Sequence, residues 1–489
     1  MAHRACVAHT MPLRRKRRGR WEWLSNDELQ LVLDHLDDRQ LAKLARVDQR
    51  THKLAKDTMR RKLGLSPSQW SAFKAVLERR ESILLMGAPG TGKSYLLTVL
   101  RERLPNSLAT ASTGAAAEKI KATTYHSALG LGLGTNPVHK ILSCKAFEMH
   151  VRKPLLQCRS LVIDEISMLT AHILNLGAQV LRAVRGNLPQ IVASGDPMQL
   201  RAVAAEEDGD FYKSHLVQGG VVIPYILTES HRQGGQGRFF RILNRARVGR
   251  ATAEDVDWLN THATANNQND AIPKLVCTTF EAYEHNRVMM ARLPSQEHTY
   301  EMTRIAKKPQ DEAMWPWTGM PFLNRLTVKV GARVLLTVNL RGSGLEGLHN
   351  GSTGVVVSCG IASVEVAFDC GITTRIGPHK MERVVNNKVV ASRLQLPLLV
   401  AFAISIHRAQ GATLDLVSVN LQREFAAGQA YVALSRAREI SDMAITGLTL
   451  PKLNHIDREA LKFYESAKRK GAHLVKKRRA AKQARARAA

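Results

Sequence analysis

Apolar residues recur at three different spacings along the chain, and each spacing predicts a different structure. Between residues 21 and 63 the spacing is helical and forms two faces, first Leu29, Val32, Leu33 and Leu36, then Leu41, Leu44, Ala45 and Val47. Ser25 and either Asp37 or Asp38 are suitable N-cap residues for such helices. This segment is therefore predicted to form a small helical module.

From about residue 64 onward, short apolar runs alternate with helical patterns. The strand-like runs are SILLMG, SLVIDE, QIVASGD and YILTES, at 82–87, 160–165, 190–196 and 225–230. Strands that alternate with helices are typical of a parallel sheet in an α/β domain.

Between about 326 and 400 the runs change again. LTVKV, ARVLLTV, TGVVVSC and SVEVAF are short and β-branched, and Gly-rich turns separate them. This pattern predicts a small β-barrel.

The charge balance limits the choice of partner. The 489 residues contain 71 Lys and Arg against 42 Asp and Glu, a formal net charge of +29. Residues 1–20 carry 7 of these cations and residues 467–489 carry 10, and neither segment contains an acid. Basic ends of this kind predict a polyanionic partner, with nucleic acid as the first candidate.

The six cysteines are far apart and form no C-x-x-C pair, which argues against a zinc ribbon and fits a reducing compartment. No run of 18 uncharged apolar residues is present, so we expect no membrane partner. The run RRKRR at 14–18 predicts a nuclear address or a nucleic-acid arm. The alternatives are a mitochondrial transit peptide, a solvated tail that aids solubility or, in a large DNA virus, the viral factory.

GAPGTGKS at 87–94 follows an apolar strand and precedes a helical run. This context makes it a strong match to the phosphate-binding P-loop, which predicts ATP and Mg²⁺ as cofactors. Glycines let backbone amides surround phosphate oxygens, the Lys93 ammonium reaches the outer phosphates, and the Ser94 hydroxyl can ligate Mg²⁺. The predicted nucleotide contacts in this loop are Gly87, Ala88, Pro89, Gly90, Thr91, Gly92, Lys93 and Ser94.

Asp164 and Glu165 follow the apolar run at 161–163, about 70 residues after the P-loop. Two carboxylates at the end of a strand suit two tasks in phosphoryl transfer. Asp164 is predicted to hold Mg²⁺, and Glu165 to polarise the attacking water.

Four later strings separate the many classes of P-loop ATPase: IVASGDPMQL, LTESHRQ, AISIHRAQGATLD and GQAYVALSRAR, which begin at 191, 227, 403 and 428. As an ordered set over about 64–448, they resemble the motifs of superfamily 1 DNA helicases, specifically the Pif/RecD-like branch. The resemblance implies two RecA-like domains with ATP in the cleft between them.

The resemblance also implies roles at the nucleotide. Gln69 would read the adenine, Gln199 would sense the γ-phosphate, and Gln410 and Gly411 would lie near the nucleotide. Arg232 and Arg436 would neutralise charge on the γ-phosphate in the transition state, because a guanidinium stays charged and matches phosphate geometry. A surface salt bridge is the alternative role for Arg436.

Contacts to single-stranded DNA are implied at further matching positions: Thr113, Gly114, Thr124, His126, Ser127, His407 and Arg408. Taken alone, His126 and His407 would more often be packed histidines. Arg408 replaces the lysine of the family string, and RAV follows GDPMQL where the family has Pro-Pro-Val. These departures leave the ATPase chemistry intact and put the duplex preference in doubt.

Residues 24–57 resemble an F-box, with Leu24, Glu28, Leu29, Val32, Leu33, Leu36, Asp37, Leu41, Leu44 and Val47 at matching positions. The resemblance implies a Skp-type adaptor as a partner. An ordinary helical hairpin is the alternative, since amphipathic helices carry little information.

The expected fold is α/β, with two RecA-like P-loop domains in tandem, a small SH3-like β-barrel insertion in the second and an N-terminal helical module. The expected boundaries are a basic arm at 1–20, the module at 21–63, domain 1 at 64–225, domain 2 at 226–448 with its insertion at about 326–395, and a basic tail at 449–489.

The expected function is that of an ATP-dependent helicase, moving 5′ to 3′ on single-stranded DNA and unwinding forked duplexes in replication, repair, recombination or telomere maintenance. The alternatives are a ubiquitin-ligase adaptor with a DNA-binding ATPase body, and a P-loop ATPase that remodels RNA or protein.

Overall fold

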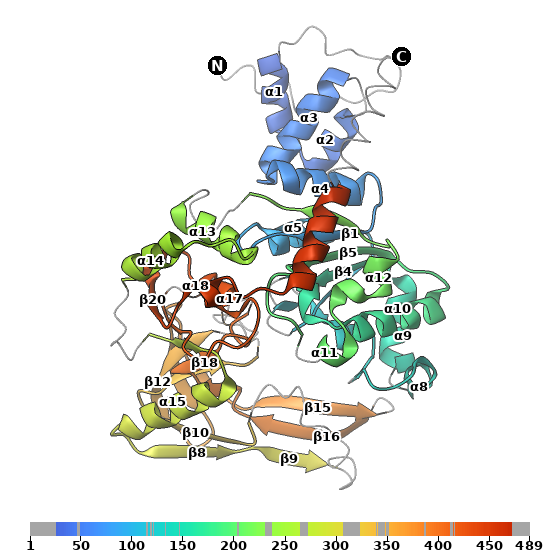
Figure 1. Ribbon diagram of the computed structural model, residues 1–489. Coiled ribbons are helices and arrows are strands. Elements are labelled where there is room, and N and C mark those ends of the chain that lie inside the picture. The colour runs from blue at the N-terminus through green and yellow to red at the C-terminus, as the bar shows by residue number, and fades with distance from the viewer. Residues whose placement is uncertain are drawn as a thin grey trace, which may run out of the picture. The chain divides into compact units, whose positions relative to one another are not determined.

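The chain divides into two compact units between Lys74 and Ala75 (Figure 1). The computed structural model describes residues 26–45, 49–113, 116–117, 120, 122–132, 134–145, 147–202, 205–229, 237–264, 272–306, 323–338, 340, 348, 352–385, 388–410, 414 and 416–471.

The first unit contains three short helices: α1 (Asn26–Asp34), α2 (Asp38–Leu44) and α3 (Gln49–Lys62). Leu29, Leu33, Leu41 and Ala55 form its buried core. Asp37 caps α2 in a capping box, since its carboxylate accepts from the Gln40 amide at 2.8 Å and the Gln40 side chain accepts from the Asp37 amide at 2.9 Å. The helical module and the Asp37 cap are confirmed, whereas Ser25 and Val47 lie outside the described residues. The F-box resemblance stays a prediction.

The second unit begins within α4 (Pro67–Leu77) and contains two α/β halves. Its first half, residues 75–229, carries a parallel six-stranded sheet in the order β3-β2-β4-β5-β1-β6. The strands are β1 (Ile83–Met86), β2 (Ser107–Ala111), β3 (Thr123–Thr124), β4 (Ser160–Asp164), β5 (Gln190–Gly195) and β6 (Ile223–Ile226). Helices α5 (Lys93–Arg101) and α10 (Ala171–Arg185) lie among the crossovers that join these strands. The four strands predicted here are confirmed, whereas β2 and β3 were not predicted.

The second half, residues 237–453, carries a parallel four-stranded sheet in the order β18-β7-β19-β20. Its strands are β7 (Lys274–Val276), β18 (Ala403–Ser405), β19 (Val417–Asn420) and β20 (Met443–Thr446). Helices α13 (Arg238–Arg247), α14 (Ala253–His262) and α17 (Gln429–Leu434) share one buried core with this sheet, and α15 (Thr279–Arg292) follows β7. Two parallel sheets confirm the α/β class.

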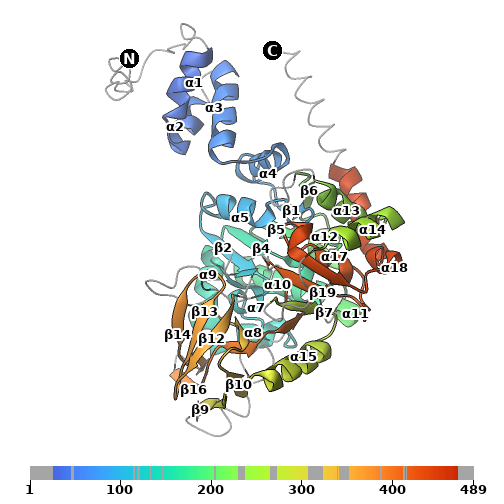
Figure 2. The same cartoon turned by 90° about the vertical axis from the view of Figure 1, so that its left-hand side faces the viewer.

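An antiparallel region is inserted between β7 and β18 (Figure 2). Strands β8 (Glu297–Glu301) and β10 (Arg325–Lys329) form a pair, and β9 (Thr303–Ala306), β15 (His379–Val385) and β16 (Lys388–Gln395) form a three-stranded sheet. A five-stranded sheet contains β11 (Arg333–Leu336), β12 (Thr353–Cys359), β13 (Val364–Phe368), β14 (Thr373–Ile376) and β17 (Leu398–Val400). The β-rich insertion is therefore present, and its SH3-like classification stays a prediction.

The expected basic tail from residue 449, for which a frayed helix and a disordered segment are the two alternatives, is helical over much of its first part. Residues 450–453 form α18, and residues 458–471 form a helix that packs on the core of the first half through Ala460 and Ala467. The Phe463 ring of this helix stacks on Tyr212 with ring centroids 5.0 Å apart. Lys and Arg dominate the composition of the segment, but its apolar residues follow a helical spacing, and that spacing determines the packing.

Among the described residues, no helix has the length and apolar character needed to cross a membrane. The five cysteines among them are free thiols, whereas Cys6 lies outside them.

Candidate active site

The loop at 87–94 connects β1 to α5, and its backbone requires glycine. Gly90 and Gly92 have φ angles of 82° and 74°, in the left-handed region that L side chains rarely adopt. A Cβ atom on Gly87 would lie 2.9 Å from the Leu227 carbonyl oxygen. The loop is thus drawn tightly against the end of β6, and Gly92 caps the helix that follows.

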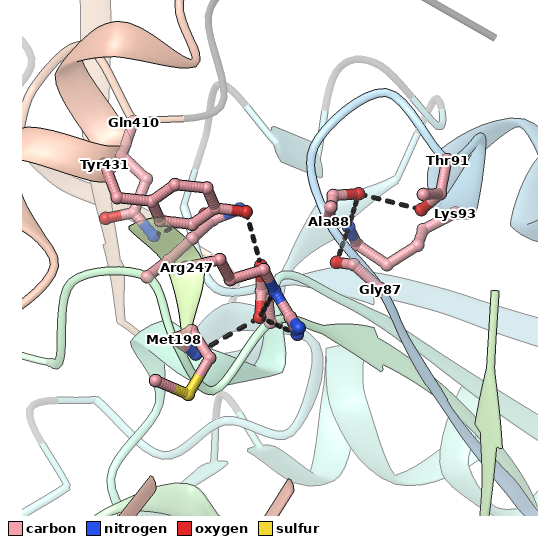
Figure 3. A network of polar contacts seen from close by, with 10 residues as sticks. Gly87, Ala88, Thr91, Lys93, Met198, Arg247, Gln410 and Tyr431 are labelled. Atoms are coloured by element: carbon pink, nitrogen blue, oxygen red, sulfur yellow. Dashed lines mark hydrogen bonds and ion pairs between the residues drawn. The ribbon is translucent and has the colours of Figure 1, made fainter. Parts of the chain in front are cut away.

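Lys93 is the cation of this loop (Figure 3). Its buried ammonium donates to the carbonyl oxygens of Gly87 at 2.8 Å and Ala88 at 3.2 Å. Burial lowers the pKa of Lys93, and the carboxylates of Asp196 and Glu165 oppose this effect. Lys93 therefore lies over the loop that the sequence assigns to phosphates.

Asp164 is the last residue of β4 and is buried. Its Oδ1 accepts a hydrogen bond from the Ser194 hydroxyl and another, 3.0 Å long, from the Glu165 amide. Its Oδ2 is buried and has no hydrogen-bond partner among the described residues. A buried carboxylate oxygen with a spare lone pair is suited to a divalent cation.

Glu165, next in the chain, has φ 51° and ψ 44°, a left-handed conformation that is uncommon for a residue other than glycine. Backbone strain of this kind costs about 1–3 kcal/mol and persists where the surrounding structure enforces it, most often at functional sites. The backbone therefore turns sharply between the two carboxylates.

The site is assembled by the order of the strands. β4, β5 and β1 are neighbours in the sheet, and the carboxyl ends of parallel strands meet at one edge. Asp164 ends β4, and Asp196 and the P-loop follow the ends of β5 and β1, so the order of the strands brings the three together.

Gln410 and Arg436 are the two predicted nucleotide-site residues of the second half that the structure describes. The Gln410 side chain donates to the Gln199 side chain at 3.2 Å, which joins the two halves at the loop after β5. Arg436 is only 2% exposed, and its guanidinium donates to the Val432 carbonyl at 2.8 Å and to the Ser435 hydroxyl at 2.7 Å. The alternative of a surface salt bridge for Arg436 is therefore wrong.

Three predicted residues receive no structural test at this site. Arg232 and Gly411 lie outside the described residues. Gln69 belongs to the first unit, where its side chain accepts a hydrogen bond from the Ser66 amide at 2.9 Å. Their roles stay predictions.

Comparison with known proteins agrees with this arrangement. A family model described as an AAA domain matches residues 64–270. The human ATP-dependent DNA helicase PIF1 is 36% identical over 83% of this chain and 64% of its own length, and the Xenopus laevis protein of the same name is 33% identical over 87% and 67%. The chain belongs to the Pif1 helicase family. It spans less than two thirds of the human relative.

A solved structure of this family, the Pif1 helicase of Candida albicans, superposes with a TM-score of 0.72. It is 28% identical, and the match covers 82% of this chain and 99% of that one. The paired parallel sheets with added antiparallel strands are thus the fold of the Pif1 family.

Predicted DNA contacts of the first half lie on one short segment. Thr124 caps α7 (Tyr125–Ala128), since its hydroxyl accepts from the Ser127 amide at 3.3 Å and donates to the Ser127 hydroxyl at 2.9 Å. His126 is half-buried, and burial lowers its pKa. Thr113 accepts from the Ala116 amide at 3.2 Å, whereas Gly114 lies outside the described residues. None of these contacts tests a role in binding DNA.

In the second half, His407 packs against Phe425, with ring centroids 6.3 Å apart and planes 22° apart. Phe425 is 59% exposed, whereas burial lowers the pKa of His407 and favours its neutral ring. The packed-histidine alternative therefore describes His407 in part, beside an aromatic face that remains open.

Arg408 lines a cavity of about 670 Å³ that the sequence did not reveal. Helix α15, strand β10, the end of β17 and strand β18 form much of its wall. Its lining includes Tyr283, which is 64% exposed, and the cations Arg287, Arg325, Lys329 and Arg408 against one carboxylate, Glu297. An exposed ring beside several cations is the usual combination for a single strand.

Arg247 (Figure 3) is a residue of this region that sequence reasoning missed. Its guanidinium pairs with the Asp196 carboxylate. The sequence of α13 contains a pattern that indicates a buried position for Arg247. Phe239, Ile242, Leu243 and Ala246 are buried at positions i, i+3, i+4 and i+7, and Arg247 occupies i+8 on the same face. A charge within an apolar stripe needs a buried partner, and the pattern could have indicated one.

Proposed function

We propose that this chain is an ATP-dependent DNA helicase that moves along single-stranded DNA and separates duplexes. The observation that carries the proposal is the meeting of two halves at one nucleotide site. P-loop and carboxylates come from β1 and β4, and Gln410 of the second half contacts Gln199 beside them. An ATPase built this way can couple hydrolysis to a relative movement of two grips.

In this proposal ATP binds on the P-loop, with the Lys93 ammonium on its outer phosphates. Asp164 and Ser94 would hold Mg²⁺, which is supported by the unpartnered Oδ2 of Asp164. When bound, Mg²⁺ neutralises negative charge on the phosphates. Glu165 would accept a proton from the attacking water, and Arg436 would stabilise the charge that develops on the γ-phosphate.

The DNA grip in this proposal has a part in each half. Thr113, Thr124, His126 and Ser127 would contact the strand from the first half. His407, Arg408 and the aromatic cavity beside α15 would contact it from the second. Cations bind the phosphates of any sequence, and exposed rings stack on any base, so such a surface suits translocation without sequence preference.

The direction of movement, 5′ to 3′, is part of this proposal and comes from the family resemblance, and single-stranded and forked DNA are its proposed partners. An RNA- or protein-remodelling ATPase would share the same nucleotide site. The Skp-type adaptor and the nuclear location stay predictions of the sequence.

One assay tests the proposal. The protein is mixed with DNA duplexes that carry a 5′ or a 3′ single-stranded tail, and with matched RNA duplexes, and strand displacement is measured with and without ATP. We expect displacement of the 5′-tailed DNA only in the presence of ATP. Lys93→Ala serves as the control and should lose both hydrolysis and displacement while it still binds DNA, because the loop cation is gone. Displacement of RNA alone, or ATP turnover in the control, would reject the proposal.

A further inference from the structure

A buried ion pair joins the two halves next to the nucleotide site. Asp196 follows β5 and is fully buried, and its carboxylate accepts three hydrogen bonds of 2.6 to 3.1 Å from the guanidinium of Arg247 in α13. The Tyr431 hydroxyl of α17 donates to the same carboxylate at 3.2 Å. The Arg247 guanidinium in turn lies 4.1 Å from the ring centroid of Tyr464, on the helix at 458–471. We call these four residues the latch.

The latch joins segments that are distant in the sequence. Asp196 belongs to the first half, Arg247 and Tyr431 to the second, and Tyr464 to the helix that returns to the first half. Burial disfavours the charge on Arg247, but the Asp196 carboxylate outweighs this effect and raises the pKa of Arg247. Arg247 therefore stays charged, and separating it from Asp196 would leave an uncompensated charge in an apolar interior.

The latch lies close in the chain to Gln199 and Arg436, the two groups assigned to the γ-phosphate. Gln199 is three residues after Asp196, in the loop whose backbone the latch holds. Arg436 is five residues after Tyr431 and follows the end of α17. Gly428, which caps the start of α17, lies so close to this loop that a Cβ atom on it would be 2.7 Å from the Met198 carbonyl oxygen. The 196–200 loop and the start of α17 are therefore closely packed.

We propose that Arg247 is a positioning residue, which fixes α17 against the 196–200 loop so that Gln199 and Arg436 address the same phosphate. The inference rests on the proposed function. It assigns Arg247 no contact with the nucleotide or DNA. A misplacement of about 1 Å at a catalytic group can cost about a hundredfold in rate, so rigid support at this point has a large effect on turnover.

The test replaces Arg247 by lysine, which keeps the charge and loses the planar fork and the stacking on Tyr464. The matched control is Arg245→Lys on the same helix, where Arg245 pairs with Asp255 rather than with Asp196. For each protein, ATP turnover is measured with and without saturating single-stranded DNA, together with the affinity for a fluorescent ATP analogue and the thermal midpoint.

We expect DNA-stimulated turnover of Arg247→Lys to fall by about tenfold to a hundredfold. In the proposed function the halves close on the nucleotide mainly when DNA is bound, so basal turnover depends little on Gln199 and Arg436. Basal turnover and nucleotide affinity should therefore remain within a few-fold of the original protein, and Arg245→Lys should keep its stimulation. A merely structural role lowers the active fraction, which reduces basal and stimulated turnover equally and leaves their ratio unchanged. An unchanged ratio, or a joint loss of basal turnover and nucleotide affinity, overturns the proposal.

A second variant covers the case in which Arg247→Lys does not fold. Tyr431→Phe keeps both charges paired and removes only the hydroxyl, and we expect its stimulation ratio to fall by about fivefold, the equivalent of one hydrogen bond. An unchanged ratio in this variant overturns the proposal as well. If the original protein itself shows no stimulation by DNA, the helicase function fails, and this outcome is distinct from a stimulated protein in which both variants behave normally.

Discussion

The two α/β halves of the second unit share a sheet type but differ in how their functional groups are placed. In the first half, the P-loop and Asp164 adjoin the ends of β1 and β4, which flank β5, so the order of the sheet brings them together. In the second half, Gln410 follows β18 and contacts Gln199 across the halves. Arg436 follows α17, and its guanidinium donates to the Val432 carbonyl within its own half. In the proposed function, one half therefore supplies the binding loop, and the other would make hydrolysis depend on how the halves meet.

The largest expected effect on ATP turnover is that of replacing Arg436. Arg436→Ala should lower ATP turnover by about a thousandfold, because a transition-state guanidinium stabilises the transition state more than bound ATP. Nucleotide affinity should change far less, since the first half retains the binding loop. Arg436→Lys should recover only part of the rate because it lacks the planar fork. The measurements are the ATPase rate and the affinity for a fluorescent nucleotide.

Arg438→Ala is the matched control for this prediction, since Arg438 lies two residues away and is exposed. Its turnover should stay near that of the original protein. Hydrolysis by Arg436→Ala within a few-fold of normal would show that the first half is catalytically complete by itself.

A smaller effect is expected in the cavity beside α15. Tyr283→Ala should weaken binding of single-stranded DNA by about tenfold, because stacking on an aromatic ring contributes about 1–3 kcal/mol per base. Tyr283→Phe keeps the ring and should bind normally. Fluorescence anisotropy with a labelled oligonucleotide measures both. Equal affinities of the alanine and phenylalanine variants would place the DNA grip of the second half elsewhere.

The smallest effect concerns the basic end. Deleting residues 472–489 removes seven Lys and Arg residues and leaves the packed helix at 458–471 intact. The slope of log affinity against log salt should become shallower, because fewer counterions are released, while turnover on saturating DNA stays unchanged. An unchanged slope would mean that the segment does not contact the phosphates.

The features that the sequence predicts well are those encoded within a few neighbouring residues. The P-loop and the Asp164–Glu165 pair each follow an apolar strand, and the structure places them at one sheet edge as expected. The helical module and four strands of the insertion, β10 to β13, were also predictable, because their periodicities are local, whereas the other strands of the insertion were not predicted. Domain boundaries and residue roles remain predictions.

The features that were missed depend on tertiary contacts or on weaker patterns. The packing of the helix at 458–471 was missed, because the segment was expected to be a frayed helix or a disordered tail, although its buried or partly buried positions Ala460, Phe463, Tyr464 and Ala467 have the spacing i, i+3, i+4 and i+7. The partner of Arg247 could not be inferred, since Asp196 is 51 residues away and nothing local connects them. A periodicity indicates which side chain is buried but not what it meets.

The return of the chain to the first half has a mechanical consequence. The second half is connected to the first at its start through 230–236 and at its end through the helix that carries Phe463. A body held at one end can swing in any direction, whereas a body held at both ends turns mainly about the line between its attachments. In the proposed cycle, anchoring at two points would favour a hinge with one principal axis, so that each opening retraces the preceding closure.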